Sequence, residues 1–295
     1  MVAKHQFKRE ELVTVFKEAQ HRQDVIDAMN TPATLKPWLD YRATFIDQKR
    51  IDGGIKFWRK HADTLARATK MYGVPQEIIV AVIGVETMYG RHAGNYRTLD
   101  ALTTLTFDYP RRVVFFRAEL EEYLLLAREQ GFNLLGIKAS YAGALGIPQF
   151  MPSSYRKHAV DFDADGTIDL LKSADDAIGS VANYLKQYGW KADEPVAIRA
   201  RIDNESRPND VGAARSIAAW DALGVIPLEN FDGGVYAYLL DFTLPVGKEY
   251  WLGFNNFAVI TTYNNSSFYA MTVYQLALEL RKNGLSYGLS RRAPL

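Results

Sequence analysis

The 295-residue sequence contains no cysteine, so it can form neither disulfide bonds nor thiolate metal sites. A cysteine-free chain is compatible with an oxidising compartment. No apolar run approaches the roughly 18 residues of a membrane helix, and the first residues, MVAKHQFKREEL, include no apolar signal region. Positive and negative charges nearly cancel, at a net charge of +1. This balance argues against a general binder of nucleic acids or membrane surfaces.

Several cofactor and metal motifs are also missing. The chain has no P-loop, no GxGxxG fingerprint and no HExxH pair, and its five histidines occur singly. We therefore expect no organic cofactor and no zinc hydrolysis.

The composition is that of a soluble globular protein, with 48% hydrophobic and 23% charged residues. The length predicts one large body or two to three subdomains. Aromatic residues are abundant, with 17 Tyr, 15 Phe and 5 Trp. Such rings can stack on sugar faces, although most are expected in the core.

Apolar residues recur at spacings of three and four over most of the chain, which predicts helices. We expect helices at 8–29, 38–65, 75–89, 111–130, 173–188 and 267–283. After Trp190 the pattern changes to the alternation typical of strands. The expected strands are VAIRARI (196–202), VYAYLLDF (235–242), EYWLGF (249–254) and FAVITTY (257–263), with a short helix at 216–224 among them. The sequence therefore predicts an α+β fold that is mainly α.

One acid, Glu86, interrupts the apolar stretch AVIGVETMYGR at 81–91. On the predicted helix it shares a face with Ile79, Val82 and Ile83, and it lies in the last turn, where the helix dipole disfavours a negative charge. Burial and dipole should both raise its pKa, as a general acid requires. The alternative is a structural Glu86 that reaches solvent or pairs with Arg91 or the arginines at 111–112.

Several long blocks resemble the membrane-bound lytic transglycosylase B family of bacterial peptidoglycan-cleaving enzymes. The two most diagnostic are GVETMYGR (84–91) and SYAGALGIPQFMPSSY (140–155). The others are YPRR (109–112), DAIGSVANY (176–184) and ITTYNNSSFYAM (260–271). The resemblance begins at about residue 38.

The resemblance implies a lysozyme-like catalytic core beside helical and β-rich parts. We expect an N-terminal helical region at 1–70, a core at 71–192 plus 257–295, and a small β-rich subdomain at 193–256. An EF-hand-like loop at 161–176 would belong to the core.

The resemblance also assigns candidate site residues. Glu86 matches the family's single acid, while Ser140 and Gln149 match residues that bind substrate near it. The positions that match the lining of the sugar groove are Tyr41, Tyr184, Tyr263, Asn264 and Tyr269. Arg111 and Arg112 match a pair expected to meet peptide-stem carboxylates, for which the arginine fork is suited. Ile147 and Pro148 depart from the family pattern, which has an aromatic residue and a glycine before the glutamine.

A single carboxyl suffices for the chemistry that the resemblance implies. The C6 hydroxyl of N-acetylmuramic acid attacks C1 of its own ring, so no water needs to be activated and the product is a 1,6-anhydro sugar. Two alternatives stay open, a hydrolase of the lysozyme type, which usually needs a second carboxyl, and a non-catalytic peptidoglycan-binding scaffold.

The resemblance further implies peptidoglycan strands and muropeptides as ligands. Cell-wall synthesis or division proteins are candidate partners, nucleic acid is not expected, and the chain is expected to be a monomer. The implied location is the periplasm of a Gram-negative bacterium, with an outer-membrane lipoprotein as a candidate form of the native precursor.

The segment DFDADGTIDL (161–170) has the spacing of an EF-hand loop. Asp161, Asp163 and Asp165 would offer side-chain oxygens and Thr167 its backbone carbonyl, which favours a structural Ca²⁺. Position 12 of the loop is Lys172 where a glutamate is standard, so Asp175 or Asp176 would have to close the site. The alternative is an acidic turn that binds no metal.

Overall fold

The computed structural model describes residues 1–31, 35–203 and 211–285. Contacts between residues divide the chain into two units. Unit 1 comprises Met1–Pro32 and Glu86–Asn183, and unit 2 comprises Ala33–Val85 and Tyr184–Leu295. Within the described ranges, every helix is too short or too polar to cross a membrane.

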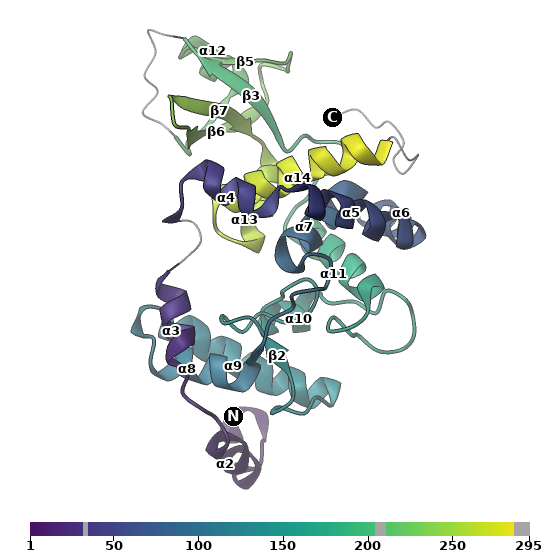
Figure 1. Ribbon diagram of the computed structural model, residues 1–295, viewed down its shortest axis with the longest axis vertical. Coiled ribbons are helices and arrows are strands. Elements are labelled where there is room, and N and C mark those ends of the chain that lie inside the picture. The colour runs from purple at the N-terminus through teal and green to yellow at the C-terminus, as the bar shows by residue number, and fades with distance from the viewer. Residues whose placement is uncertain (32–34, 204–210, 286–295) are drawn as a thin grey trace. The chain divides into compact units, whose positions relative to one another are not determined.

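Unit 1 is built around a helix, α8 (Thr98–Phe107), which is buried from Thr98 to Thr106. Helix α9 (Val113–Gln130) lies beside α8, and α10 (Pro152–His158) contacts α9 (Figure 1). The remaining elements are α1 (Val2–His5), α2 (Arg9–Lys17), α3 (Gln23–Asn30), the 3₁₀ helix η2 (Pro110–Arg112) and the two-stranded sheet of β1 (Tyr96–Arg97) and β2 (Lys138–Ala139).

The segment between α2 and α3 is joined to α8 by partly buried polar contacts. The amide of Gln20 donates to the Asp100 carboxylate at 3.0 Å, and the amide of Arg22 donates to Thr104 Oγ1 at 3.0 Å. Asp100 in turn pairs with Arg97 at 2.7 Å. Each bond satisfies a polar group inside unit 1, so the first 30 residues are fastened to the buried helix.

The helical part of unit 2 is organised on α14 (Ser267–Leu285). Helices α4 (Trp38–Phe45), α5 (Gln48–Lys60) and α13 (Asn255–Tyr263) contact α14, and α6 (Ala62–Tyr72) contacts α5. Two further helices, α7 (Gln76–Thr87) and α11 (Ala174–Gln187), begin in one unit and end in the other.

The sheet of unit 2 is five-stranded and antiparallel, with the order β4-β6-β7-β3-β5. Figure 1 labels four of these strands, β3, β5, β6 and β7. The strands are β3 (Ala197–Ile202), β4 (Ala214–Ser216), β5 (Val225–Pro227), β6 (Tyr236–Thr243) and β7 (Lys248–Gly253). The short helix α12 (Ile217–Ala222) buries Trp220 against residues of one sheet face that include Leu239 and Leu252. Ser216 caps α12 by accepting a hydrogen bond from the amide of Ala219, as its sequence predicts.

The predicted α+β, mainly α fold is confirmed, with one element of the wrong type. FAVITTY (257–263), predicted as a strand, lies in helix α13. Its Phe257, Val259 and Ile260 are buried, and α13 contacts α14 and β7. Tertiary burial has therefore overridden the β propensity of its branched residues.

The predicted helix at 38–65 is divided into α4, α5 and α6. The first break has a local cause, because Asp47 caps α5 by accepting from the amide of Arg50 at 2.7 Å. The predicted helix at 8–29 is likewise divided into α2 and α3. The domain division at 1–70, 71–192 with 257–295, and 193–256 stays a prediction.

Candidate active site and acidic loop

Glu86 lies in the last turn of α7 and is half-buried. In the preceding turns Ile79, Val82 and Ile83 are fully buried, and the next residue, Thr87, is 1% exposed. The carboxyl therefore stands at the end of an apolar helix, as the sequence predicts. The predicted rise in the pKa of Glu86 stays a prediction.

Helix α7 ends in three consecutive residues of the left-handed region. The φ angles of Met88, Tyr89 and Gly90 are 51°, 64° and 84°. The Thr87 hydroxyl accepts from the amide of Gly90 at 2.9 Å and donates to the carbonyl oxygen of Ile147 at 2.8 Å. The buried Thr87 side chain thus provides a partner for a backbone amide of the turn and also links the turn to the segment that contains Ile147.

That segment, residues 139–150, is a compact pair of turns. Leu145 and Phe150 exchange backbone hydrogen bonds of 2.7 and 3.1 Å, and Leu145 also bridges to Ala139. The amide of Ala144 donates to the Ser140 hydroxyl at 3.1 Å. The turns need glycine at 146, where a Cβ would lie 2.2 Å from the carbonyl oxygen of Leu170.

Gln149 adopts a left-handed conformation with a φ of 52°. Its side-chain amide donates to the carbonyl oxygens of Ala93 at 3.1 Å and Gly146 at 2.9 Å. The Gln149 amide thereby joins the segment after α7 to the turns. Ser140 and Gln149 therefore both lie in the segment that Thr87 fastens to the end of the Glu86 helix.

Glu119 is a buried carboxyl that the sequence analysis missed. It lies on α9 at 4% exposure and accepts from the Ser153 amide at 3.0 Å and the Ser153 hydroxyl at 2.7 Å. Burial raises the pKa of Glu119, and the two bonds from Ser153 partly oppose that rise. The signal was present in the sequence, because Glu119 shares a helix face with Phe116 and Tyr123.

Arg111 and Arg112 are exposed on η2. The Arg112 guanidinium lies 4.1 Å from the centre of the Phe115 ring and 5.4 Å from that of Phe116. Stacking on these rings orients the planar group while leaving its edge available to an anion.

The tyrosines predicted to line a sugar groove belong to unit 2, where three form one cluster. The Tyr263 ring lies 4.8 Å from that of Tyr184 and 6.3 Å from that of Tyr269, centre to centre. Tyr184 and Tyr269 are buried, and the Tyr184 hydroxyl donates to the carbonyl oxygen of Thr262 at 2.8 Å. Tyr263 is half-buried and Asn264 is exposed, so these two residues form the accessible part of the cluster.

Tyr41 lies in a different aromatic group of unit 2. Its buried ring is 5.1 Å from Phe45, 5.6 Å from Phe268 and 6.5 Å from Trp38. The assignment of Tyr41 to the sugar groove stays a prediction.

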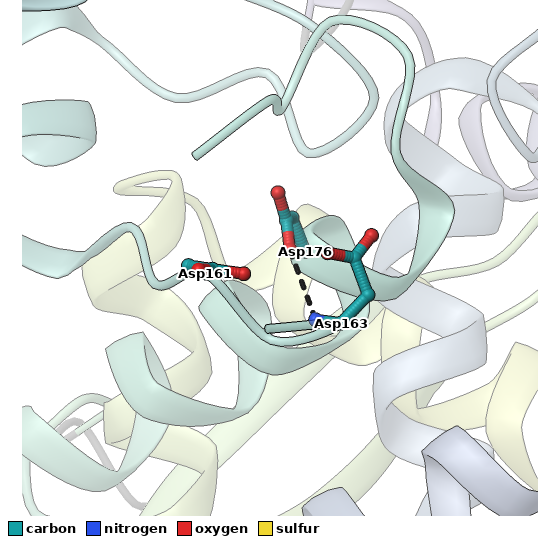
Figure 2. Close-up of side chains that lie close together, drawn as sticks. All are labelled: Asp161, Asp163 and Asp176. Atoms are coloured by element: carbon teal, nitrogen blue, oxygen red, sulfur yellow. Dashed lines mark hydrogen bonds between the residues drawn. The ribbon is translucent and has the colours of Figure 1, made fainter. Parts of the chain in front are cut away.

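Three acids of the predicted metal loop converge. Carboxylate oxygens of Asp161, Asp163 and Asp176 lie within 4.8 Å of one another, and Figure 2 shows the three side chains facing a common space. Asp161 and Asp163 come from the loop and Asp176 from the first turn of α11. Of the two candidates for the closing ligand, Asp176 belongs to this group and Asp175 does not.

The Asp176 carboxylate also organises the loop backbone. It accepts from the amides of Phe162 and Asp169, each at 2.7 Å, and more weakly from Asp163 at 3.4 Å (Figure 2). Asp176 is 1% exposed, and burial raises its pKa. A buried carboxyl beside two other acids is strained unless a cation or protons offset the charge.

The rest of the loop is shaped as a sharp turn. Gly166 has a φ of 91° and its amide donates to Asp161 at 2.9 Å. Asp165 accepts from the amide and the hydroxyl of Thr167, and these bonds lower the pKa of the Asp165 carboxyl. The donor set is all oxygen, which fits Ca²⁺ better than zinc.

The chain is similar to known proteins over most of its length. A family model described as a transglycosylase SLT domain matches residues 1–278. Membrane-bound lytic murein transglycosylase B of Escherichia coli (strain K12) is 44% identical over 286 residues, which are 94% of this chain and 79% of the relative.

Solved structures are similar over nearly the whole chain. Soluble lytic transglycosylase SltB1 from Pseudomonas aeruginosa matches with a TM-score of 0.89 and 49% identity, over 96% of each chain. Escherichia coli Slt35 in complex with calcium matches with a TM-score of 0.89 and 43% identity, over 97% of this chain and 91% of Slt35. Pseudomonas aeruginosa SltB3 in complex with NAG-anhNAM-pentapeptide matches with a TM-score of 0.82 and 31% identity, over 94% of this chain and 76% of SltB3. The chain therefore belongs to the transglycosylase SLT domain family of lytic murein transglycosylases, which are enzymes that act on peptidoglycan.

Proposed function

We propose that this chain cleaves the β-1,4 bond between N-acetylmuramic acid and N-acetylglucosamine and leaves 1,6-anhydromuramyl ends. The observation that carries the proposal is the position of Glu86, half-buried at the end of an apolar helix whose next residue is fastened to the Ser140–Gln149 segment. SltB3, a relative, has been solved with a NAG-anhNAM-pentapeptide, a fragment with such an end.

Glu86 acts twice in this reaction. Its carboxyl first donates a proton to the glycosidic oxygen, so that the C1–O bond breaks and the N-acetylglucosamine leaves with a free hydroxyl. The resulting carboxylate then takes the proton of the muramyl C6 hydroxyl while O6 forms a bond to C1. Glu86 ends protonated and no water is consumed. The tethered hydroxyl has a high effective concentration, which explains why one carboxyl suffices.

We assign substrate binding to the polar and aromatic groups that the sequence resemblance singles out. Ser140 and Gln149 hold the sugar beside Glu86, and Gln149 also keeps the local backbone in place through Ala93 and Gly146. Tyr263 and Asn264 offer an accessible ring and amide for the glycan, and the buried Tyr184 and Tyr269 support the Tyr263 ring. We also assign Tyr41 to the lining of the sugar groove, as the sequence resemblance implies.

The two arginines suit the peptide stems. Arg111 and Arg112 are exposed, and Arg112 is oriented by Phe115. A guanidinium presents two parallel N–H groups to a carboxylate, so we assign this pair to the acidic groups of muropeptides.

We also infer a structural Ca²⁺ in the EF-hand-like loop at 161–176. Asp161, Asp163 and Asp176 would hold the ion through carboxylates, with Asp165 and the Thr167 carbonyl completing the oxygen set. Bound calcium would neutralise the crowded charges and stabilise the loop without taking part in the reaction. The complex of Slt35 with calcium supports the assignment.

The setting of this activity is the bacterial envelope. We propose a periplasmic location in a Gram-negative bacterium, with an outer-membrane lipoprotein as the native precursor, in keeping with the membrane-bound relative. The chain would act as a monomer on peptidoglycan strands, with cell-wall synthesis or division proteins as candidate partners.

Mass analysis of the products tests the proposal. The purified chain is incubated with peptidoglycan sacculi, and the soluble muropeptides are separated and weighed. Anhydro ends, which are one water lighter than reducing ends, are the expected result. Reducing ends would identify a hydrolase, and uncleaved glycan would identify a binding scaffold, so either outcome would overturn the proposal.

A further inference from the structure

Unit 2 contains a cavity of about 700 Å³. It lies among α6, the first residues of α7, α14 and the segment that leads into β3. Pockets that hold small organic ligands commonly measure about 300–1,000 Å³. None of the lining residues is among those assigned above to glycan or calcium, so the proposed function leaves this cavity unexplained.

The cavity walls are aromatic, and their polar atoms are already satisfied. Trp58 Nε1 donates to Gln76 Oε1 at 2.7 Å, Trp190 Nε1 to the Gly73 carbonyl at 3.1 Å, and the Tyr274 hydroxyl to the Ala197 carbonyl at 2.8 Å. These groups therefore have little need of a ligand's hydrogen bonds. What the walls offer is apolar surface and ring faces, which suit an aliphatic or aromatic body.

The charges around the cavity are mainly negative. Five carboxyl groups line it, those of Asp63, Glu77, Asp193, Glu194 and Glu229, against the single guanidinium of Arg281. One of the five, Glu194, pairs at the surface with Lys191 at 3.1 Å. The excess of carboxyl groups favours a cationic ligand over an anionic one.

Glu77 is the carboxyl whose setting differs most from bulk water. Burial raises its pKa, and the charge of Arg281 only partly offsets the rise. A desolvated carboxyl gains most from a new positive partner, because the low dielectric strengthens the attraction.

The carboxyl groups of the cavity do not form a metal site. In the described part of the chain, the one group of three acids whose ligand atoms lie within 4.8 Å of one another is that of Asp161, Asp163 and Asp176. Acids spread around an aromatic wall suit an extended organic cation instead.

We propose that this cavity is a second ligand site, which binds an organic cation with an apolar body. The body packs against Trp58, Trp190 and Tyr274, and the ammonium or guanidinium group faces Glu77. This site goes beyond glycan cleavage, because it takes a different chemical class and uses different residues.

A matched set of three probes tests the proposal on the full chain. These are 4-phenylbutylamine, the neutral 4-phenylbutan-1-ol and the anionic 4-phenylbutanoate, measured by calorimetry and tryptophan fluorescence at about pH 8, where ordinary carboxyl groups are ionised. The amine is expected to bind one to one with a Kd of about 1 mM or tighter. It should bind at least tenfold more tightly than the alcohol, and the carboxylate should bind most weakly.

Variants locate the site. Glu77→Gln keeps the shape of the side chain and should weaken the amine at least threefold while leaving the alcohol unchanged. Ala66→Trp places a bulky ring at an exposed lining position and should block both probes. Glu10→Gln, an exposed carboxyl of α2 in unit 1, is the control and should change nothing. Thermal melting confirms that each variant is folded.

The proposal is overturned by any of three results. These are no binding of the amine at about 1 mM, equal affinity for the amine and the alcohol, or amine binding that survives unchanged in folded Glu77→Gln and Ala66→Trp. Muropeptide cleavage, assayed on the same samples, reports separately on the proposed function.

Discussion

The hydroxyl of Thr87 donates a hydrogen bond to the carbonyl oxygen of Ile147 at 2.8 Å, deep inside unit 1. The bond joins the residue after the proposed acid to the turns that hold Ser140 and Gln149. The Ile147 amide is itself held by the Leu170 carbonyl at 2.8 Å. Ile147 therefore contributes its backbone carbonyl and its backbone amide to this arrangement.

Thr87→Val keeps the size of the side chain but removes the donor. The Ile147 carbonyl and the Gly90 amide would both lose their Thr87 partner, and we expect about 1–3 kcal/mol of lost stability for unsatisfied buried groups. The initial rate of cleavage should fall more than the affinity for muropeptides. Thr103→Val is the matched control, because that buried hydroxyl bonds to carbonyls of its own helix. Equal activity in the two variants would argue against a positioning role for Thr87.

Gln149 combines a left-handed backbone with two side-chain hydrogen bonds, and two variants separate these features. Both Gln149→Ala and Gln149→Gly lose the two side-chain hydrogen bonds. Alanine also retains the free-energy cost of a left-handed backbone, whereas glycine adopts a φ of 52° without that cost. We expect both variants to lose most of their activity, and the glycine variant to melt at a higher temperature than the alanine variant. Activity retained in the glycine variant would show that Gln149 serves only the turn.

The buried carboxyl of Glu119 should make stability depend on pH. Its pKa in the folded protein is raised, so the folded chain binds the proton more tightly than the unfolded chain. Its contribution is therefore most favourable below the ordinary glutamate pKa of about 4.5 and is lost as pH rises through the raised folded value. In Glu119→Gln the side chain at this position cannot ionise, so this pH-dependent loss of stability should be absent. Urea titration at several pH values gives the unfolding free energy of the wild type and of the variant. The wild-type value minus the variant value should decrease as pH rises through that window. A difference that stays constant with pH would contradict a raised pKa for Glu119.

Calcium should raise the melting temperature, through a gain of about 1–3 kcal/mol when the ion is well above its Kd. Asp163→Asn should reduce this response, because Asp163 belongs to the converging group and is exposed. The neighbouring Asp175→Asn is the control and should respond like the wild type. A melting temperature that is equal in calcium and in chelator would contradict the metal site. Loss of the calcium response in Asp175→Asn would show that Asp175, rather than Asp176, closes the site.

Local patterns in the sequence predicted much of the fold. The expected strands at 196–202, 235–242 and 249–254 correspond to β3, β6 and β7, and the short capped helix to α12. Helix α7 begins and ends close to its predicted bounds because Pro75 and Gly90 punctuate it. The strand predicted at FAVITTY was wrong, because its branched residues suit a strand locally. The helix is favoured by contacts with α14 and β7, which the local sequence does not show.

The site was predictable in its parts but not in its connections. The sequence places Glu86 on an apolar face, yet it cannot show that Thr87 reaches Ile147 or that Gln149 reaches Ala93, since these bonds join segments about 60 residues apart. Asp175 and Asp176 are adjacent and chemically alike, so the sequence does not distinguish them. The direction of each side chain on the first turn of α11 places Asp176 beside the other two acids. The cavity of unit 2 has no local signal, because its wall collects residues from 58 to 281.

We predict that Glu86 alone supplies the acid and the base. Sacculi incubated with wild type, Glu86→Gln and the exposed control Glu10→Gln are digested, and the products are weighed. We predict anhydromuropeptides from wild type and Glu10→Gln, and none from a folded Glu86→Gln chain that still binds muropeptides. Anhydro products released by Glu86→Gln at a rate near that of wild type would contradict this role of Glu86.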